Sequence, residues 1–251
     1  MEDNSFIIDT MTWSFSRINA FGSKDSCRKE WHDHYISCEP SVNSFDGMAG
    51  SCIHSVLESY FKGEISEFDM PEIFEERYKK EVTLPCPYPN GDTKFPKILE
   101  YLNNFSFDKD KYEILGVEKK VEFKIGEYNC IGFIDLLVRD KESGEISLID
   151  HKTSTIKFTK AGKVSKTDEE HLKAFIRQQY LYSKVILEEY GQVNFLKWNM
   201  VKDQNEICIP WKKEEMDETF KWAEETIKAI ERFNASITSR SIDGIGIIKN
   251  K

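Results

Sequence analysis

The hydrophobic positions of the chain follow two periods, and the change from one to the other divides the sequence. Up to about residue 104, apolar residues recur every three to four positions, which predicts amphipathic helices. The predicted helices cover about residues 14–21, 27–36, 48–61, 71–81 and 95–104. The stretch "PCPYPNGD" interrupts this pattern at residues 85–92 with prolines and turn residues.

Residues 112–152 instead alternate between apolar and polar positions, which predicts three strands joined by the glycine-containing turns "IGEY" and "DKESGE". A helix, two strands and a final amphipathic helix follow, at about residues 168–191, 193–201, 206–211 and 212–236. This order predicts a mixed α/β (α+β) fold with an N-terminal helical region. We expect a single domain over residues 1–251. Residues at about 60–110 are a candidate helical insertion within this domain.

Composition is that of a folded globular protein, with 39% hydrophobic and 31% charged residues. No apolar run approaches the roughly 20 residues that span a bilayer, so we expect no membrane partner. The acidic start "MEDNSFIIDT" lacks the features of a secretory signal. The cysteines, which we interpret as reduced thiols of a cytoplasmic protein, are Cys27, Cys38, Cys52, Cys86, Cys130 and Cys208.

The charge is unevenly distributed along the chain. A net charge of -9 argues against a protein that coats nucleic acid through general electrostatics. However, residues 152–166, "KTSTIKFTKAGKVSK", hold five lysines and no acid. This segment is either a solvated loop or a loop that contacts phosphates beside a site.

The turn between the second and third strands of the meander brings two carboxylates together. If it is centred between Glu142 and Ser143, then Asp135 and Asp150 are equidistant from the centre and face each other across an antiparallel pair. The same reasoning, applied to a less well-defined turn at Gly126-Glu127, places Glu118 opposite Asp135.

Carboxylates this close repel each other unless a proton or a cation compensates. Hard cations such as Mg²⁺ prefer carboxylate oxygens, water and phosphate as ligands. Lys152 shares a strand face with Asp150, because side chains at i and i+2 point the same way. The set predicts either a metal-dependent site or an ion pair with a structural role only. The apolar neighbours of Asp135 favour the metal site.

Four segments, taken together and in order, resemble the PD-(D/E)XK nuclease superfamily. They are "GSCIHSVLE", "GFIDLLVRD", "LIDHKTS" and "RQQYLYS", and they are most similar to the RecB-like exonuclease branch. The motif positions are Gly50, His54, Glu58, Gly132, Asp135, Asp150, Lys152, Thr153, Gln178 and Tyr182. The resemblance covers roughly residues 12–187 and implies a restriction-endonuclease-like core with a central mixed sheet flanked by helices.

The resemblance also implies roles for these residues. His54, Asp135 and Asp150 would hold Mg²⁺ or Mn²⁺, together with the backbone carbonyl of His151. Lys152 would position or deprotonate the attacking water. The imidazole of His151 should point to the opposite face of its strand.

The remaining motif residues have structural alternatives. Glu58 or Glu118 is a candidate ligand for a second metal. Gln178 and Tyr182 would support the site or contact the substrate, although both could simply pack a helix against the sheet. His54 and Glu58 likewise share one helix face, and a lone histidine there is commonly a packing residue.

Two other metal centres are less well supported by the pattern. Several RecB-like nucleases hold an iron-sulfur cluster with one early cysteine and three late ones. Here Cys27 is followed by no late triplet, so we expect no such cluster. The group Cys27, His32, His34 and Cys38 superficially resembles a zinc site, but its members would not converge on one continuous helix.

The leading hypothesis is a metal-dependent, sequence-independent DNA exonuclease of recombination, repair or phage DNA processing. Its partners would be single-stranded or double-stranded DNA ends, with a helicase or recombinase as a further candidate partner. It would act in the cytoplasm of a bacterium or a phage-infected host. One alternative is a catalytically inactive nucleic-acid-binding module with the nuclease fold. Another is an unrelated α/β protein with a structural Asp-Lys pair.

Overall fold

The computed structural model describes residues 11–22, 28–37 and 44–246, and for 237–246 only the backbone. The chain divides into two compact units. The first unit comprises residues 1–41, 122–132 and 213–251, and the second comprises 42–121 and 133–212. The single domain over residues 1–251 and the helical insertion at about 60–110 stay predictions.

The described strands form one mixed sheet in the order β1-β3-β4-β5-β6, with β2 paired to β3. Their bounds are β1 Trp13–Ser14, β2 Tyr112–Ile125, β3 Tyr128–Asp140, β4 Ile146–Lys152, β5 Phe195–Met200 and β6 Asn205–Pro210. The pairs β1–β3 and β4–β5 are parallel, whereas β3–β4 and β5–β6 are antiparallel. The predicted meander and the mixed α/β class are therefore confirmed.

Every predicted helix is present, and most ends shift by a few residues, but the C-terminal helix continues to Gly246 instead of ending at about residue 236. The bounds are α2 Phe15–Gly22, α3 Arg28–Tyr35, α4 Phe45–Phe61, α5 Met70–Glu81, α6 Lys94–Asn103, α7 Glu169–Tyr190 and α8 Lys213–Gly246, with a 3-10 turn η1 at Val201–Asp203. Helix α4 begins earlier than predicted, because the Ser44 side chain caps it by accepting a hydrogen bond from the Gly47 amide. Helix α7 ends where the sequence predicts, with Gly191 in the left-handed conformation.

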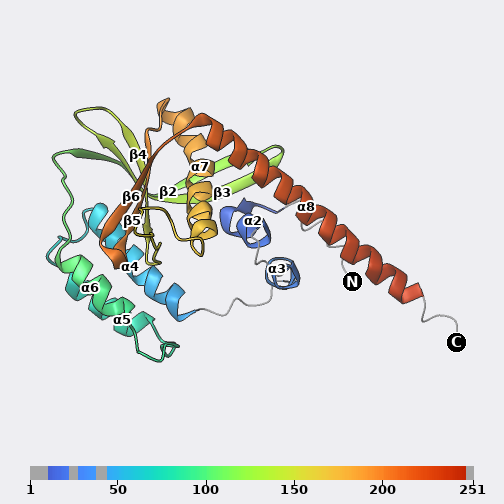
Figure 1. Ribbon diagram of the computed structural model, residues 1–251, viewed down its shortest axis with the longest axis horizontal. Helices are drawn as coiled ribbons and strands as arrows, with labels where there is room; N and C mark the ends of the chain where they lie inside the picture. Colours follow the sequence, from blue (N-terminus) through green and yellow to red (C-terminus); the bar gives the residue numbers. More distant parts are fainter. Residues whose placement is uncertain (1–10, 23–27, 38–43, 247–251) are drawn as a thin grey trace. The chain divides into compact units, whose positions relative to one another are not determined.

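The core of the second unit lies between α4, α5, α6 and the sheet. Leu57, Phe74 and Ile98 from these helices are fully buried with Leu136 of β3. Helix α7 lies on the other side of the same strands (Figure 1), where Gln179 Nε2 donates a 2.7 Å hydrogen bond to the β5 backbone. Strand β4 is therefore covered on both faces, which explains its nearly continuous burial.

The first unit has its own aromatic packing. Strand β1 pairs with the start of β3 through Trp13 and Cys130. Phe21 of α2 packs edge-on against Trp31 of α3 and lies 5.7 Å from Phe233 of α8, measured between ring centroids. No described helix combines the length and apolar character needed to cross a membrane.

Candidate active site

The β3–β4 pair has the register that the turn predicts. Leu136 faces Ile149 and Arg139 faces Ile146, and both pairs are equidistant from the centre of the turn between Glu142 and Ser143. Continuing this register by one residue brings Asp135 opposite Asp150. The two carboxylates are close enough for the charge of Asp135 to raise the pKa of Asp150.

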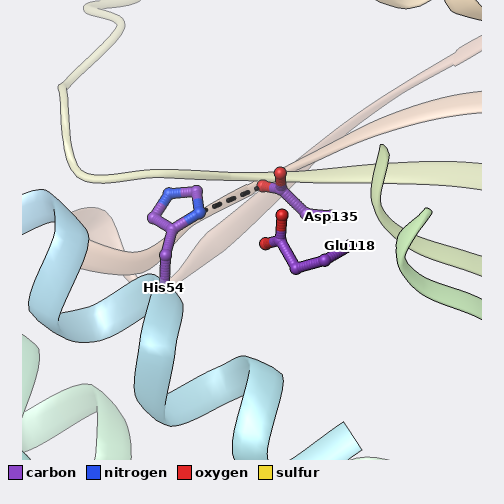
Figure 2. A group of neighbouring side chains, drawn as sticks. All are labelled: His54, Glu118 and Asp135. Atoms are coloured by element: carbon purple, nitrogen blue, oxygen red, sulfur yellow. Dashed lines mark ion pairs between the residues drawn. The ribbon is translucent and has the colours of Figure 1, made fainter. Parts of the chain in front are cut away.

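Beyond the last ladder pair, the Asp135 side chain becomes the acceptor for a backbone amide. The amide of His151 donates to Oδ2 of Asp135 at 2.7 Å. His54, on α4, places Nδ1 3.4 Å from the same oxygen. Figure 2 shows the imidazole of His54 facing this carboxylate from the helix. The structure therefore brings together two of the predicted metal ligands from segments far apart in the chain.

Glu118 completes a three-residue group with them. One donor atom from each of His54, Glu118 and Asp135 lies within 4.8 Å of the other two. Figure 2 shows the three side chains converging on one volume. One imidazole nitrogen and two carboxylates suit a divalent cation, because carboxylate oxygens favour Mg²⁺ and Mn²⁺ and imidazole is a good transition-metal ligand. These residues fit the metal that the sequence implies.

Glu118 occupies an unusual backbone conformation. Its φ is 47°, in the left-handed region, although it lies inside β2. A non-glycine residue held there stores strain of roughly 1–3 kcal/mol. The alternation of burial is absent from Ile114 to Lys119, which are all partly buried, and it is regular from Val121 onward. Burial, followed by the like charge of Asp135, raises the pKa of Glu118.

Asp150 and Lys152 form a buried pair next to this group. Lys152 Nζ lies 2.7 Å from Oδ2 of Asp150, as an ion pair without the geometry of a directed hydrogen bond. The same ammonium donates to Gln178 Oε1 of α7 at 3.2 Å. Burial raises the pKa of the Asp150 carboxyl, the Lys152 ammonium opposes this, and Asp135 adds to it. The predicted residues Asp150, Lys152 and Gln178 thus form one connected chain.

The imidazole of His151 points away from these carboxylates, as the strand period predicts. Its Nδ1 lies 3.0 Å from Nδ2 of Asn199 on β5, and its ring stacks on Phe61 with an interplanar angle of 6°. Burial lowers the pKa of this imidazole to about 3, so the ring is neutral at physiological pH. Metal ligation by the backbone carbonyl of His151 stays a prediction.

The other predicted site residues lie outside the His54–Glu118–Asp135 group. Asp150 is not a member of the His54–Glu118–Asp135 group. Glu58 is also outside it, because its carboxylate pairs with Lys62 one turn further along α4. Tyr182 is buried on α7 and lines, with Asp135 and Asp150, a small cavity of about 10 Å³, which has room for about one water molecule.

Helix α4 and the end of β4 come close to each other at two motif residues, Gly50 and Thr153. A Cβ atom added at Gly50 would lie 3.6 Å from Oγ1 of Thr153. This is an ordinary van der Waals distance, so Gly50 marks a close contact between α4 and the end of β4 but does not require glycine.

The lysine-rich segment after β4 forms a small hairpin, here called the lysine hairpin (residues 157–166). Phe158 bridges to Val164, and the amide of Ser165 donates to the Lys157 carbonyl at 2.7 Å. Its exposed lysines are Lys157, Lys160, Lys163 and Lys166. The amide of Lys157 also donates to Asp168 Oδ2, which ties the hairpin to the start of α7.

A family model described as the PD-(D/E)XK nuclease superfamily matches residues 12–240. The chain belongs to this superfamily. The match extends beyond the motif segments and includes the last two strands and most of α8. Nucleases of this superfamily use divalent metals, which agrees with the donor set at His54, Glu118 and Asp135.

The fold of this nuclease is similar to a crystal structure from Eubacterium rectale that carries a provisional name as an exonuclease. The TM-score is 0.58 at 14% sequence identity, over 94% of this chain and 86% of the other. At this identity the likeness shows the fold alone, and that fold confirms the restriction-endonuclease-like core. Among curated proteins, no match to the chain is found.

The cysteine-based alternatives cannot be placed fully. Cys27 and Cys38, on which the iron-sulfur and zinc comparisons depend, lie outside the described residues. The described cysteines, Cys52, Cys86, Cys130 and Cys208, are free thiols.

Proposed function

We propose that this nuclease is a divalent-metal-dependent, sequence-independent exodeoxyribonuclease. The observation that carries the proposal is the His54–Glu118–Asp135 group, in which Asp135 lies close to the Asp150–Lys152 pair. His54, Asp135 and Glu118 would hold the metal, with Asp150 as a further ligand from the facing strand. A bound divalent cation acidifies the attacking water and neutralises charge on the phosphoryl oxygen.

The residues around the metal group would do the rest of the chemistry. Lys152, held between Asp150 and Gln178, has an ammonium placed to orient a water molecule and to stabilise charge that develops on the phosphate. Tyr182 limits the space beside the two aspartates. Glu58 and its partner Lys62 lie near Glu118 and influence its charge.

The lysine hairpin supports a substrate with a phosphate backbone. No described carboxylate pairs with the side chains of its exposed lysines, so they remain available for phosphates. Phosphate contacts carry no sequence information, which agrees with sequence-independent cutting. We propose DNA ends as the substrate. The proposed role is in recombination, repair or phage DNA processing, with a helicase or recombinase as partner.

A digestion panel tests this function. Linear, circular, single-stranded and end-labelled DNA are incubated with Mg²⁺, Mn²⁺ or EDTA, with the Asp150→Ala variant in parallel. We expect metal-dependent release of short products from linear DNA and none from circular DNA or from the variant. Cleavage of circular DNA would instead show endonuclease action. DNA binding without cleavage in any metal would identify a catalytically inactive binding module.

A further inference from the structure

A cavity of about 370 Å³ lies on the opposite face of β4 from Asp150 and Lys152. Ile149 and His151 line it, and they alternate along β4 with Asp150 and Lys152, which face the other way. The residues between α6 and β2, at 105–108, form part of its wall. Its volume is within the range of about 300–1,000 Å³ that is typical of small-ligand sites.

Five aromatic side chains form a large part of the wall. They are Phe61, Tyr101, Phe105, Phe107 and Tyr112. The rings differ in orientation, with Phe61 stacked on His151 and Phe107 inclined by 30° to Tyr112. Such ring faces favour a flat, polarisable ligand. A planar ring that stacks on an aromatic side chain gains binding energy whatever substituents the planar ring carries.

A polar pair lies within this aromatic wall. Asn199 Nδ2 donates to the hydroxyl oxygen of Tyr101 at 2.7 Å and lies 3.0 Å from His151 Nδ1. Within the described part of the chain, neither the hydroxyl proton of Tyr101 nor Oδ1 of Asn199 has a partner. Burial raises the pKa of Tyr101 to about 12, so its hydroxyl keeps the proton it can donate. An adjacent donor and acceptor complement the edge of a nucleobase.

Two lysines line the cavity beside the Tyr112 ring. Lys111 Nζ and Lys197 Nζ lie 5.2 Å and 5.9 Å from its centroid. Each has a carboxylate nearby, with Asp140 3.7 Å from Lys111 and Glu206 3.4 Å from Lys197. The carboxylates balance the lysine charges when the cavity is empty, and the ammonium groups can bind an anionic group when it is occupied.

We propose that this cavity binds a nucleobase of a mononucleotide unit. The base would lie among the aromatic rings, with its edge on Tyr101 and Asn199, and its phosphate would lie by Lys111 and Lys197. The site is separate from Asp150 and Lys152, which face the other side of β4. The unit is either a free nucleotide or an unpaired nucleotide of a strand. Because His151 forms part of the wall and its amide holds Asp135, an occupant contacts a residue that positions the catalytic carboxylate.

Calorimetry with the full chain in EDTA tests binding without cleavage. The panel contains nucleosides, their 5′-monophosphates, ribose 5-phosphate and inorganic phosphate. We expect nucleosides to bind, monophosphates to bind more tightly, and ribose 5-phosphate not to bind. Tyr101→Phe should weaken nucleoside binding about tenfold, as expected for one lost hydrogen bond. Ser106→Trp, which fills the cavity, should abolish it.

Tyr88→Phe is the matched control, because Tyr88 bonds Asp46 outside the cavity and should leave affinity unchanged. Thermal melting verifies that each variant is folded. A single-stranded oligonucleotide that displaces the mononucleotide identifies the strand as the source of the base, and failure to displace it identifies a free nucleotide. The proposal is overturned if no nucleoside or nucleotide binds at millimolar concentration, or if folded Ser106→Trp binds as well as the native chain.

Discussion

The backbone amide of His151 donates a 2.7 Å hydrogen bond to Oδ2 of Asp135 across the β3–β4 pair. This bond ties the orientation of the carboxylate to the backbone of the strand that carries Asp150 and Lys152. Fixed donors and ligands of this kind reduce the rearrangement needed when a metal and a phosphate bind. The strand pair itself thus organises the proposed active site, and variants there should separate chemistry from folding.

Asp135→Asn should remove a metal ligand and keep an oxygen that can accept the His151 amide. Loss of groups that only support a ligand lowers metal affinity or activity by about 10–100-fold, so loss of the ligand should lower cleavage by more than roughly 100-fold. Mn²⁺ titration calorimetry and single-turnover cleavage measure the two effects. Glu142→Gln, in the exposed turn between the same strands, is the control. Unchanged Mn²⁺ affinity in Asp135→Asn would rule out this ligand.

Glu118→Gly should increase stability while it weakens metal binding. Glycine relieves the strain at φ 47°, although it also increases the entropy of the unfolded chain, so the net gain should be roughly 1 kcal/mol or less. Glu118→Gln is the matched variant, since it removes the charge but keeps the strain. Urea unfolding at pH 7 should rank Gly above Gln. The opposite ranking would contradict a strained, functionally retained Glu118.

Lys152→Met should abolish cleavage without abolishing metal binding. Loss of an acid–base or charge-stabilising group typically lowers the rate by about 10²–10⁴-fold. The change also leaves Asp150 buried without its cation, which should destabilise the metal-free protein by roughly 3–5 kcal/mol. Single-turnover rates and urea unfolding in EDTA measure these effects. Lys184→Met, which removes only an exposed pair with Glu188, is the control, and a normal cleavage rate in Lys152→Met would remove this lysine from the mechanism.

Replacing the exposed lysines of the lysine hairpin by glutamine should weaken DNA binding and reduce its salt dependence. Each phosphate contact contributes about 0.7–0.9 to the slope of log affinity against log salt, so four lost contacts should lower it by about 3. Fluorescence anisotropy in EDTA at several salt concentrations measures the slope. The control changes net charge equally through lysines already in helical ion pairs, namely Lys79, Lys184, Lys213 and Lys228. Equal slopes for the two variants would show that the hairpin is merely solvated.

The metal-free protein should lose stability as pH falls below about 6.5, in part because of His151. Its folded-state pKa is lowered to about 3, so between that value and the ordinary histidine pKa of 6.5 the unfolded chain binds the extra proton. His151→Phe keeps an aromatic ring against Phe61 and should flatten this dependence between pH 7 and 5. Urea midpoints in EDTA across this range provide the measurement. An unchanged pH dependence in the variant would contradict the burial of a neutral imidazole.

The order of the helices, the meander and the β3–β4 register could all be predicted from the sequence. These features depend on short-range physics. Side-chain period distinguishes helix from strand, and the turn length decides which residues of a hairpin face each other. The facing of Asp135 and Asp150, the shared face with Lys152 and the opposite direction of the His151 imidazole follow from these rules. The ordered motifs then indicated the family, because their spacing is local within each element.

Other features were decided only by the tertiary structure. The sequence named both Glu118 and Glu58 as candidate ligands. Only the structure shows that Glu118 lies in the metal group with an irregular backbone conformation, and that Glu58 pairs instead with Lys62. His54 reaches Asp135 because α4 packs against strands far away in the chain. The aromatic cavity likewise forms where segments from α4, α6 and five strands meet. Such contacts depend on how side chains of distant segments fit together, which local periodicity and turn geometry do not determine.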